Sequence, residues 1–367
     1  MSTSIIYKKV SYRELLKSNP FINYDDKYGL GDFITNNIKK CFIKSPNTIL
    51  DKTAAIIAIE NNTIVGRHVF YGTKVCIDGT IIDAFATGST EVHVSQRGKG
   101  IGSNFNKITL EHKEYSMYLF SMVTSAYLSI LSKEQNKCTI FQFPQLIKIN
   151  NMYYAFKCRN FPGMFLNIST KLANGILWIY NTRNRYRLKQ LLKVYKLNKL
   201  TKVPEWAGYM CINHSFKFSE LHNTEWLQWN LDNNLSGNRR DIQSFYSIER
   251  DNKPVGFFMT KERVRTDVPN CSNMIRGTIC EWASIDKYLT ESDINILATS
   301  TFSKDCYHIL TVTNDSVTLK KLKSLGFISY GFMQMGFQDR GILLKYPEMK
   351  DINQWRIRFA CCNSMLY

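Results

Sequence analysis

A glycine-rich segment, Gln96-Arg97-Gly98-Lys99-Gly100-Ile101-Gly102, stands between a strand-like run and a stretch with helical spacing. Ile101, Phe105 and Ile108 recur at intervals of four and three residues, which predicts a helix that continues to Glu114. The first amides of a helix have no intrahelical acceptor and lie at the positive end of the helix dipole. Because glycines leave these amides unhindered, and Arg97 and Lys99 add positive charge, the segment favours binding of a phosphate group. The fold must therefore present this loop at the end of a strand and the start of a helix.

The residues before the loop predict an antiparallel meander. Short β-branched or aromatic runs are separated by Glu60-Asn61-Asn62 and by Asp78-Gly79, both of which favour hairpins. These runs are Ala54–Ile59, Ile64–Tyr71 and Ile81–Thr87, and a fourth run, Ser89–Val94, leads into the glycine segment. After the helix we expect a strand at Tyr115–Val123, a helix at Ser125–Glu134 and a strand at Cys138–Ile149. The meander argues against a dinucleotide site, which needs a parallel βαβ unit, and the loop lacks the spacing of a G-x-x-x-x-G-K-[ST] nucleotide loop.

The final third of the chain repeats this order of elements more faintly. We expect a hairpin from Ser244–Glu249 and Val255–Thr260, strands at Thr278–Ile285, Cys306–Thr313 and Gly331–Phe337, and helices at Thr290–Ser303 and Ser316–Leu325. At about 150 residues per domain, the 367 residues suggest two domains. We place them at 1–150 and 205–367, joined by a basic helical segment at 151–204. The expected fold class is α/β (α+β), with a mixed, mostly antiparallel sheet flanked by helices in each domain.

Composition excludes several protein classes. Hydrophobic residues make up 44% of the chain and aromatic residues 13%, which excludes a disordered protein. The first ten residues hold no long apolar region, so no secretory signal is expected, and only the polar-interrupted segment 160–180 approaches the length of a membrane-spanning helix. The ten cysteines show no C-x-x-C spacing, so we expect reduced thiols and a cytoplasmic protein. The six histidines are scattered and none pairs with a cysteine at ligand spacing, so no metal site is expected.

The glycine segment resembles a motif of a known family. Val92-His93-Val94-Ser95-Gln96-Arg97-Gly98-Lys99-Gly100-Ile101-Gly102-Ser103 is similar to the acyl-CoA loop of the GCN5-related N-acetyltransferase (GNAT) superfamily, in which the fourth strand leads into R/Q-x-x-G-x-G/A and helix three. With the upstream hairpin containing Ile64-Val65-Gly66, the resemblance covers roughly residues 50–150. Val94 replaces the proline, and Gln96 the aromatic residue, that many members have, but neither change removes a backbone donor.

The resemblance implies how acetyl-CoA would bind. By this resemblance, the CoA pyrophosphate would be held by the backbone amides of Arg97, Gly98, Lys99, Gly100, Ile101, Gly102 and Ser103. The backbone near Glu91–Val94, including Val92 and Val94, would meet the pantetheine arm and polarise the thioester carbonyl.

The same resemblance implies a base that deprotonates the attacking ammonium and a donor for the leaving thiolate. The central strands offer Asp83, Glu91 and His93 as candidate bases. Strand alternation places Glu91 and His93 on one face, so these two side chains can act together. The thiolate donor of the family is usually a tyrosine in the helix after the fifth strand, where this chain has Tyr127. For each of these residues the alternative is a structural role, facing solvent or satisfied in a core network.

A later segment also resembles the superfamily. Asn314 and the sequence LKKLKSLGF at Leu319–Phe327 are similar to the segment that closes its fold, which implies a second GNAT-like domain over roughly residues 205–345. No glycine precedes its first predicted helix, and Thr290 with Asp293 predicts a capping box there. Because the chain's own carboxylate would take the place that a phosphate needs, we expect this half to lack CoA binding. It would instead complete the acceptor cleft or brace the first domain, a division similar to that in mycothiol synthases and Fem-type aminoacyltransferases.

The net charge of +18 is concentrated in one segment. Residues 151–204 carry eleven Lys and Arg side chains and no Asp or Glu, whereas residues 205–367 are nearly neutral. The apolar residues from Tyr186 to Leu197 predict a helix packed across both domains. Because eleven positive charges exceed what packing needs, we expect an acidic partner: an anionic membrane surface that also uses the apolar residues 164–180, a phosphorylated or nucleotide-linked acceptor, or tRNA. The alternative is a solvated helix face, and no recognised nucleic-acid module accompanies the segment.

Three functional hypotheses follow. The first is a cytoplasmic acyl-CoA-dependent N-acyltransferase, most simply an acetyltransferase, in which an amine directly attacks the thioester of acetyl-CoA. Its acceptor amine, which the basic segment suggests is acidic or phosphate-bearing, is expected near the domain junction. Residues 164–202 would contact the inner face of the membrane, and nucleic acid is not expected to bind. The second hypothesis is a Fem-like aminoacyltransferase that uses charged tRNA, and the third is a non-catalytic adaptor at a membrane surface.

Overall fold

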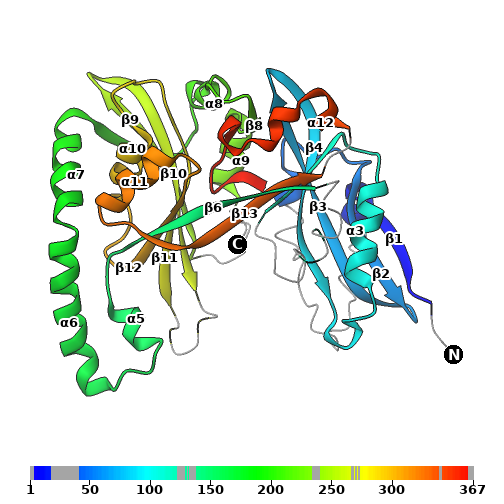
Figure 1. The fold of residues 1–367 in the computed structure, drawn as a ribbon, viewed down its shortest axis with the longest axis horizontal. Helices are drawn as coiled ribbons and strands as arrows, with labels where there is room; N and C mark the ends of the chain where they lie inside the picture. The colour runs from blue at the N-terminus through cyan, green and yellow to red at the C-terminus, as the bar shows by residue number, and fades with distance from the viewer. Residues whose placement is uncertain are drawn as a thin grey trace.

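The computed structural model describes residues 4–17, 41–121, 129, 131, 138–233, 240–265, 268, 271, 273–338 and 341–362. These residues form one large mixed sheet with helices packed on it (Figure 1). The strands follow the order β1-β2-β3-β4-β5-β13-β6-β12-β11-β10-β9-β7, with β8 beside β3 and β14 beside β8. Most neighbours are antiparallel, and β4–β5, β11–β12 and β8–β14 are parallel. The predicted mixed α/β class is confirmed.

The strands are β1 (Ile6–Ser11), β2 (Thr53–Glu60), β3 (Thr63–Ile77), β4 (Thr80–Val92), β5 (Met117–Ser121), β6 (Cys138–Ile149), β7 (Lys196–Leu200), β8 (Phe218–Glu220), β9 (Ile242–Arg250), β10 (Lys253–Arg265), β11 (Met274–Ser284), β12 (Cys306–Val312), β13 (Ile328–Gln338) and β14 (Trp355–Arg356). The helices are α1 (Tyr12–Lys17), α3 (Ile101–Glu111), α5 (Tyr153–Lys157), α6 (Gly163–Tyr180), α7 (Thr182–Val194), α8 (Glu205–Ile212), α9 (Thr224–Asp232), α10 (Glu291–Thr299), α11 (Ser316–Ser324) and α12 (Ile342–Lys345).

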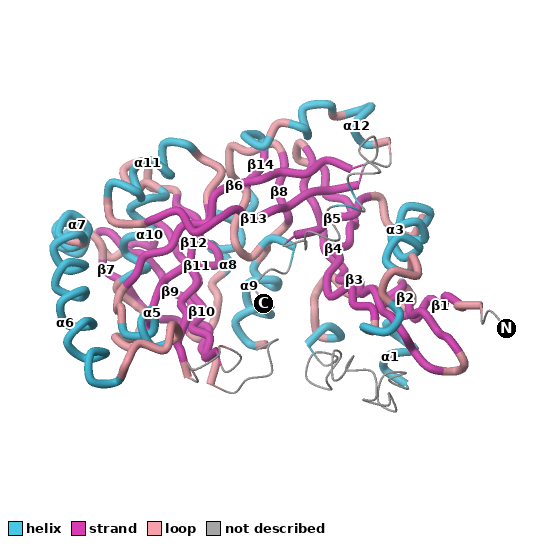
Figure 2. Tube along the Cα trace, turned by 60° about the horizontal axis from the view of Figure 1, so that its bottom comes forward, coloured by secondary structure: helices cyan, strands magenta, loops and turns pink. Residues whose placement is uncertain are grey.

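The two halves of the chain exchange one strand each. β13, from the C-terminal half, lies between β5 and β6, while β6, from the N-terminal half, lies between β13 and β12 (Figure 2). Phe337 of β13 is paired with Leu119 of β5 on one side and with Thr139 of β6 on the other. Each half of the sheet therefore contains a strand from the other half. The two expected domains share one continuous sheet, and the boundaries at residues 150 and 205 stay a prediction.

The hairpin turns have the backbone that their sequences predict. Asn61 and Asn62, with φ of 49° and 59°, join β2 to β3, and Asp78 and Gly79, with φ of 48° and 81°, join β3 to β4. Positive φ at both central residues matches the right-handed twist of the flanking strands, and Asn, Asp and Gly adopt it most readily. The antiparallel meander is thus confirmed, as is the later hairpin, which is β9–β10.

Some predicted boundaries were wrong. Ser89–Val94 is not a separate strand, because β4 continues from Thr80 to Val92 without a turn. The helix after the glycine loop ends at Glu111 rather than at Glu114. The helix predicted at Ser125–Glu134 lies largely outside the described residues.

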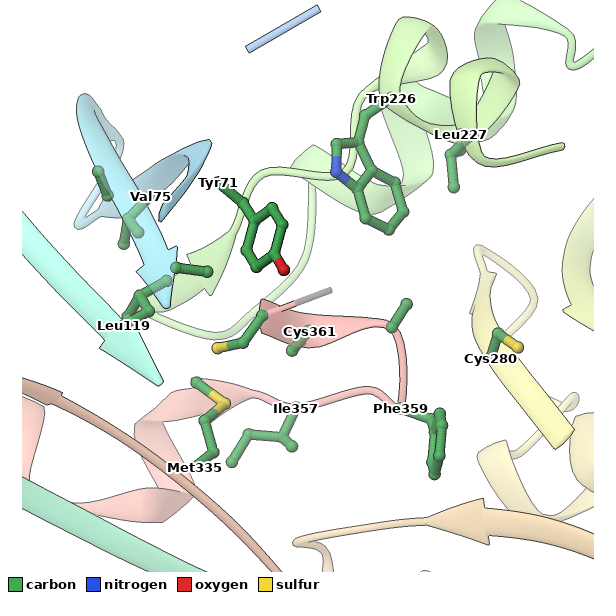
Figure 3. Close-up of a cluster of buried hydrophobic side chains, with 14 of the residues drawn as sticks. Tyr71, Val75, Leu119, Trp226, Leu227, Cys280, Met335, Ile357, Phe359 and Cys361 are labelled. Atoms are coloured by element: carbon green, nitrogen blue, oxygen red, sulfur yellow. The ribbon is translucent and has the colours of Figure 1, made fainter. Parts of the chain in front are cut away.

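The largest cluster of buried apolar side chains lies where the two halves meet. Figure 3 shows Val75 of β3, Leu119 of β5 and Met335 of β13 around the C-terminal segment that carries Phe359, with Cys280 of β11 on its other side. Two smaller clusters pack beneath α3 in the N-terminal half and beneath α7, α10 and α11 in the C-terminal half. The main core therefore belongs to both halves at once.

A buried ion-paired network crosses the same junction. The carboxylate of Glu281 on β11 accepts a hydrogen bond from Arg356 Nη2 at 2.6 Å and pairs with His222 Nδ1, and all three side chains are at most 2% exposed. His222 Nε2 lies 3.6 Å from Glu220, whose other carboxylate oxygen accepts from Thr73 Oγ1 of β3 at 2.6 Å. Burial by itself would raise the Glu281 pKa, but the charges of Arg356 and His222 outweigh it and lower the pKa to about 2. The network joins β3 to β11 and to the C-terminal segment.

The basic segment lies at an outer edge of the sheet rather than at the junction. It forms α5, α6, α7 and β7, and β7 is the last strand, at the opposite end from β1 (Figure 1). α7 packs against α10 of the C-terminal half, and Leu197 lies in β7. The prediction of a helix packed across both domains was wrong, because β6 and β13 make that connection. Among the described helices, α6 included, none has the length and apolar content needed to cross a membrane.

Cys158, directly after α5, and Cys271, in the connection between β10 and β11, form a disulfide. This pair contradicts the expectation that all ten thiols are reduced. The two cysteines are 113 residues apart, so no local spacing pattern indicates the pair. Because disulfides are uncommon in reducing compartments, the cytoplasmic location stays a prediction.

Gly336→Ala is expected to destabilise the whole sheet. Gly336 lies on β13 between β5 and β6, where an added Cβ would come within 2.2 Å of the Thr139 carbonyl oxygen and 2.5 Å of the Phe120 ring. Overpacking of this kind costs about 1–3 kcal/mol, so we expect a lower urea midpoint in a single unfolding transition followed by tryptophan fluorescence. Gly175→Ala in α6, where a Cβ meets nothing within 4 Å, is the control and should raise the free energy of unfolding by roughly 0.5–1 kcal/mol. Unchanged stability of Gly336→Ala would contradict the strand exchange.

Candidate functional site

β4 and β5 part within the N-terminal half of the sheet. Their pairing ends at Thr87 and Phe120, while β4 stays paired with β3 as far as Val92. Between these points β4 has a bulge, since two of its residues, 89 and 90, lie opposite the single residue His68 of β3. Bulges bend a strand and re-aim its side chains. In the described part of the chain, β4 from Gly88 to Val92 therefore has no strand on the side away from β3, which leaves that edge for another group to bind.

The glycine loop follows directly. His93 caps a single 3₁₀ turn (Val94–Gln96), and Gly98 and Gly100 have φ of 85° and 76°, values that glycine adopts without strain. Gly100 is the N-cap of α3 and supplies no capping side chain. Among the described residues, the backbone amides of Gly98, Gly100, Ile101, Gly102 and Ser103 have no acceptor. The first turn of α3 also lacks an acidic residue, so this helix start is open to an anion.

Glu60, at the end of β2, holds this loop in place. Its carboxylate accepts a hydrogen bond from Gln96 Nε2 at 2.7 Å and pairs with Lys99 Nζ at 3.5 Å, while only 12% of the Glu60 side chain is exposed. Arg97 Nε donates to the Val92 carbonyl oxygen at 3.2 Å, and its side chain is otherwise exposed. Sequence reasoning missed Glu60, which it assigned only to a turn. Positive charge toward an incoming phosphate therefore comes mainly from Arg97, since Lys99 is partly neutralised.

Backbone direction singles out Val92 on the open edge of β4. The His93 amide donates to the Val65 carbonyl oxygen of β3 at 2.9 Å. Because successive amides of a strand point to opposite edges, the Val92 amide points away from β3, toward the side that β5 has left. The Val92 carbonyl group points to the same side, which is consistent with the hydrogen bond that its oxygen accepts from Arg97 Nε. Val94 follows in the 3₁₀ turn and is 67% exposed.

Two of the candidate bases lie beside this edge, each with its own partner. Glu91 forms an ion pair with Arg67 Nη2 of β3; the Glu91 side chain is 38% exposed and that of Arg67 only 4%. His93 is 8% exposed, and its Nδ1 lies 2.7 Å from Ser95 Oγ. The structure places both residues after the point where β4 and β5 part.

The other two candidates are not brought to this place by the described structure. Asp83 precedes the stretch of β4 that is paired with β5, lies opposite Lys74 of β3 and is exposed. It is thus separated from Glu91 along the strand. Tyr127 lies outside the described residues, so its role as thiolate donor stays a prediction.

His68 is a positioning residue that sequence reasoning missed. Its Nδ1 lies 2.6 Å from Thr90 Oγ1 in the β4 bulge, and its Nε2 lies 2.8 Å from the Tyr118 hydroxyl on β5. The ring therefore connects the two strands at the point where they separate. Its side chain is fully buried, and burial lowers its pKa to about 3, so the ring is neutral. The only sequence signal was a histidine, next to Arg67, within a predicted strand.

The corresponding helix start in the C-terminal half is occupied by the chain itself. Thr290 caps α10, its hydroxyl accepting from the Asp293 amide at 3.2 Å and donating to the Asp293 carboxylate at 2.8 Å. The same carboxylate binds Arg187 of α7 through two hydrogen bonds of 2.8 and 2.7 Å. The predicted pairing of Thr290 with Asp293 at this helix start is confirmed, although the Asp293 carboxylate bonds the Thr290 hydroxyl rather than its backbone amide. An anion at this position would have to displace a buried and ion-paired carboxylate.

One group of described residues has metal-ligand chemistry. Glu220, His222 and Cys361 are buried and place ligand atoms within 4.8 Å of one another. Several of their atoms are already engaged, since His222 Nδ1 pairs with Glu281 and Glu220 accepts from the Cys362 amide at 2.5 Å, whereas His222 Nε2 has no hydrogen bond to a described residue and lies 3.6 Å from the Glu220 carboxylate. The guanidinium of Arg356 lies against the same Glu281 carboxylate and would repel a cation. The group is better explained as part of the junction network, and the absence of a metal stays a prediction.

No family model and no curated relative matches the chain by sequence. Its fold is similar to that of several solved structures. They include Saccharomyces cerevisiae N-myristoyltransferase with bound myristoyl-CoA (TM-score 0.57, 13% identity, 92% of this chain and 79% of the other) and a GCN5-related N-acetyltransferase from Anabaena variabilis (TM-score 0.54, 9% identity, 91% and 72%). A probable N-acyltransferase from Enterococcus faecalis matches with a TM-score of 0.54 and 11% identity over 91% and 72%. The chain therefore shares its fold with these structures over about nine tenths of its length, which agrees with the GNAT-like fold that the loop indicated.

The buried His68 is expected to make stability depend on pH. Its pKa is about 3 in the folded protein and about 6.5 in the unfolded chain, so below pH 6.5 the unfolded chain binds a proton that the folded protein does not. Each pH unit between these values should cost about 1.4 kcal/mol of stability. We expect His68→Gln to remove the contribution of this one histidine to the slope of unfolding free energy against pH. Urea unfolding at pH 7, 6, 5 and 4 measures that slope. His214 and His308, whose pKa values burial lowers to about 4, keep their own contributions. An identical slope in the variant and the wild type would contradict this assignment.

Proposed function

We propose that the chain is an acyl-CoA-dependent N-acyltransferase that transfers an acetyl group from acetyl-CoA to an amine. The observation that supports this proposal is the convergence of five unpaired amides, at Gly98 and from Gly100 to Ser103, at the start of α3. They stand next to the stretch of β4 that β5 has left. A pyrophosphate suits the amides, and the pantetheine arm, with its own amide groups, suits the open strand edge.

The proposed reaction is a direct attack. The base takes a proton from the acceptor ammonium, and the amine nitrogen bonds to the thioester carbonyl carbon. The carbon–sulfur bond then breaks, the nitrogen releases its second proton, and the sulfur takes up one proton, for which Tyr127 is the proposed donor, so that CoA leaves as a thiol.

The Val92 amide, which points toward the open edge, is the donor we assign to the carbonyl oxygen. Glu91 is the base that we favour, because its carboxylate is partly exposed and Arg67 holds it in place. His93 is the second candidate and Asp83 the third.

The acceptor is proposed to enter near β5 and β13, where the two halves meet. The basic segment lies at the far edge of the sheet, so it lends no support to an acidic or phosphate-bearing acceptor at this place. Contact of residues 164–202 with a membrane is a separate part of the proposal. Thiol release from acetyl-CoA and from myristoyl-CoA, measured with amino sugars, polyamines and peptides, selects both the acyl length and the class of amine.

Gly100→Asp is expected to abolish CoA binding. The added carboxylate would lie beside the pyrophosphate and repel it, and like charges in contact cost several kcal/mol, so we expect a loss of roughly a hundredfold or more. Isothermal titration calorimetry with CoA and acetyl-CoA measures it, with micromolar binding expected for the wild type.

Gly79→Asp is the matched control for this substitution. Gly79 has φ of 81°, close to the 76° of Gly100, and at both positions a Cβ meets nothing within 4 Å. The strain of the substitution is therefore the same, but Gly79 lies in the β3–β4 turn and should leave CoA binding intact. Loss of binding in both variants, or in neither, would contradict the proposed loop. Binding of charged tRNA without CoA would favour the Fem-like aminoacyltransferase, and binding of neither would favour a non-catalytic adaptor.

Glu91→Gln is expected to lower the rate of thiol release by about 10²-fold or more while CoA affinity is unchanged, because a general base contributes about 10²–10⁴. The double variant Arg67→Met with Glu91→Gln removes both members of the ion pair and tests whether folding explains any loss. An unchanged rate in Glu91→Gln would reject Glu91, and the same assay on His93→Gln and Asp83→Asn would then decide between the remaining bases.

A further inference from the structure

We propose that the outer face of α6, together with the exposed basic side chains of α7, binds the surface of an anionic membrane. This inference concerns the outer edge of the sheet and does not depend on the acyl-transfer reaction. We call this surface the docking face. It comprises Phe165, Ile168, Leu172, Ile176, Trp178 and Ile179 of α6 with the basic residues Lys171, Arg183, Lys189 and Lys193.

The apolar residues of α6 form a stripe that points into solvent. Phe165, Ile168, Leu172, Ile176 and Ile179 follow one another at spacings of three and four residues, which places them on one face of the helix. Their exposed fractions range from 51% to 70%. A surface helix normally buries its apolar stripe and exposes its polar face. In α6 these five apolar residues are exposed instead, while Leu166 and Leu177 on the other side of the helix are half-buried.

Polar contacts hold the helix in this orientation. The inner face carries Asn174, which accepts a hydrogen bond from the Met152 amide at 2.8 Å and donates to Asn151 Oδ1 at 3.2 Å. At the end of the helix, Asn181 accepts from Lys148 Nζ of β6 at 2.9 Å. The disulfide of Cys158 fixes the preceding α5. Rotating α6 to bury its stripe would break the Asn174 contacts, so the exposed stripe is built into the fold.

The charge next to the stripe selects an anionic surface. Lys171 on α6 and Arg183, Lys189 and Lys193 on α7 are exposed, and residues 151–204 contain no Asp or Glu that would repel anionic headgroups. α6 and α7 follow each other along the same edge of the molecule in both views (Figures 1 and 2). An apolar face flanked by Lys and Arg is typical of helices that lie in the plane of a membrane interface.

The shape and aromatic residues favour a membrane over a protein partner. The stripe is a ridge one helix wide and about 21 Å long, from the 14 steps of 1.5 Å between Phe165 and Ile179, rather than a patch of the area that stable protein interfaces bury. Trp178 and Tyr180, which are 64% and 51% exposed, lie at its C-terminal end, and Trp and Tyr are enriched at membrane interfaces. α6 is too polar to cross a bilayer, so it would lie on the surface.

Vesicle flotation with the full chain tests the proposal. We expect binding to phosphatidylcholine vesicles that contain about 30% phosphatidylglycerol, weaker binding to pure phosphatidylcholine, and a decrease as salt rises from about 0.1 to 0.5 M, because each basic residue near the surface adds attraction that salt screens. Ile176→Glu should weaken binding about tenfold or more, since it removes an apolar side chain that the membrane would bury and adds a negative charge that the anionic headgroups would repel. Leu344→Glu, at a residue that is 91% exposed on α12, is the matched control and should bind like the wild type.

Tryptophan fluorescence gives an independent readout of depth. Trp178 is exposed, whereas Trp206 is half-buried and the other four tryptophans, Trp226, Trp229, Trp282 and Trp355, are at most 6% exposed. Vesicles with brominated acyl chains should quench the wild type, and Trp178→Phe should remove most of this quenching while flotation persists.

Several results would overturn the proposal. These are equal binding of Ile176→Glu and the wild type, no preference for anionic vesicles, or quenching that persists in Trp178→Phe. A dimer in light scattering that Ile176→Glu converts to a monomer would assign the stripe to a second copy of the chain instead. CoA calorimetry on Ile176→Glu separates the two proposals, because the docking face and the glycine loop lie on different elements at opposite ends of the sheet.

Discussion

The exchange of β6 and β13 is the constraint on which the rest of the structure depends. Each strand completes the half of the sheet to which it does not belong by sequence, so neither half has a full sheet without the other. The main core and the Glu281 network lie on the same junction and include residues from both halves. Strand pairing of this kind is non-local, and its contacts stabilise the protein only after both halves have come together. The contacts at the junction are therefore needed to hold the fold together, in addition to any role in binding a substrate.

Within this frame the two halves differ at one helix start. In the N-terminal half, α3 begins with glycines and no carboxylate, and its amides are open. In the C-terminal half, α10 begins with Thr290 and Asp293, and Arg187 neutralises the carboxylate. The same positive end of a helix is thus available to a ligand in one half and satisfied internally in the other. This difference, rather than the overall charge of the chain, determines where a phosphate-bearing cofactor is proposed to bind.

Local features of the fold could be predicted from the sequence because their causes are local. The turns at Asn61–Asn62 and Asp78–Gly79, the glycine loop and the Thr290 helix cap each depend on a few adjacent residues. The strand exchange, the Cys158–Cys271 disulfide and the bond between His68 and Tyr118 join residues that are distant in sequence, so no pattern indicates them. The same limit explains the wrong position of the basic segment: its composition was informative about charge, but its place depends on where β6 ends. Glu60 could not be recognised from the sequence, because it contacts Gln96 of the glycine loop only in the folded protein.

The central claim is that the glycine loop of the N-terminal half binds CoA and the matching helix start of the C-terminal half does not. Hydrogen–deuterium exchange followed by mass spectrometry, with and without CoA, tests it most directly, because backbone amides are the groups assigned to the ligand. If CoA binds as proposed, exchange becomes slower in peptides that cover residues 88–104 and does not change in peptides that cover residues 286–295. Protection of residues 286–295, or no protection of residues 88–104 at saturating CoA, would contradict it.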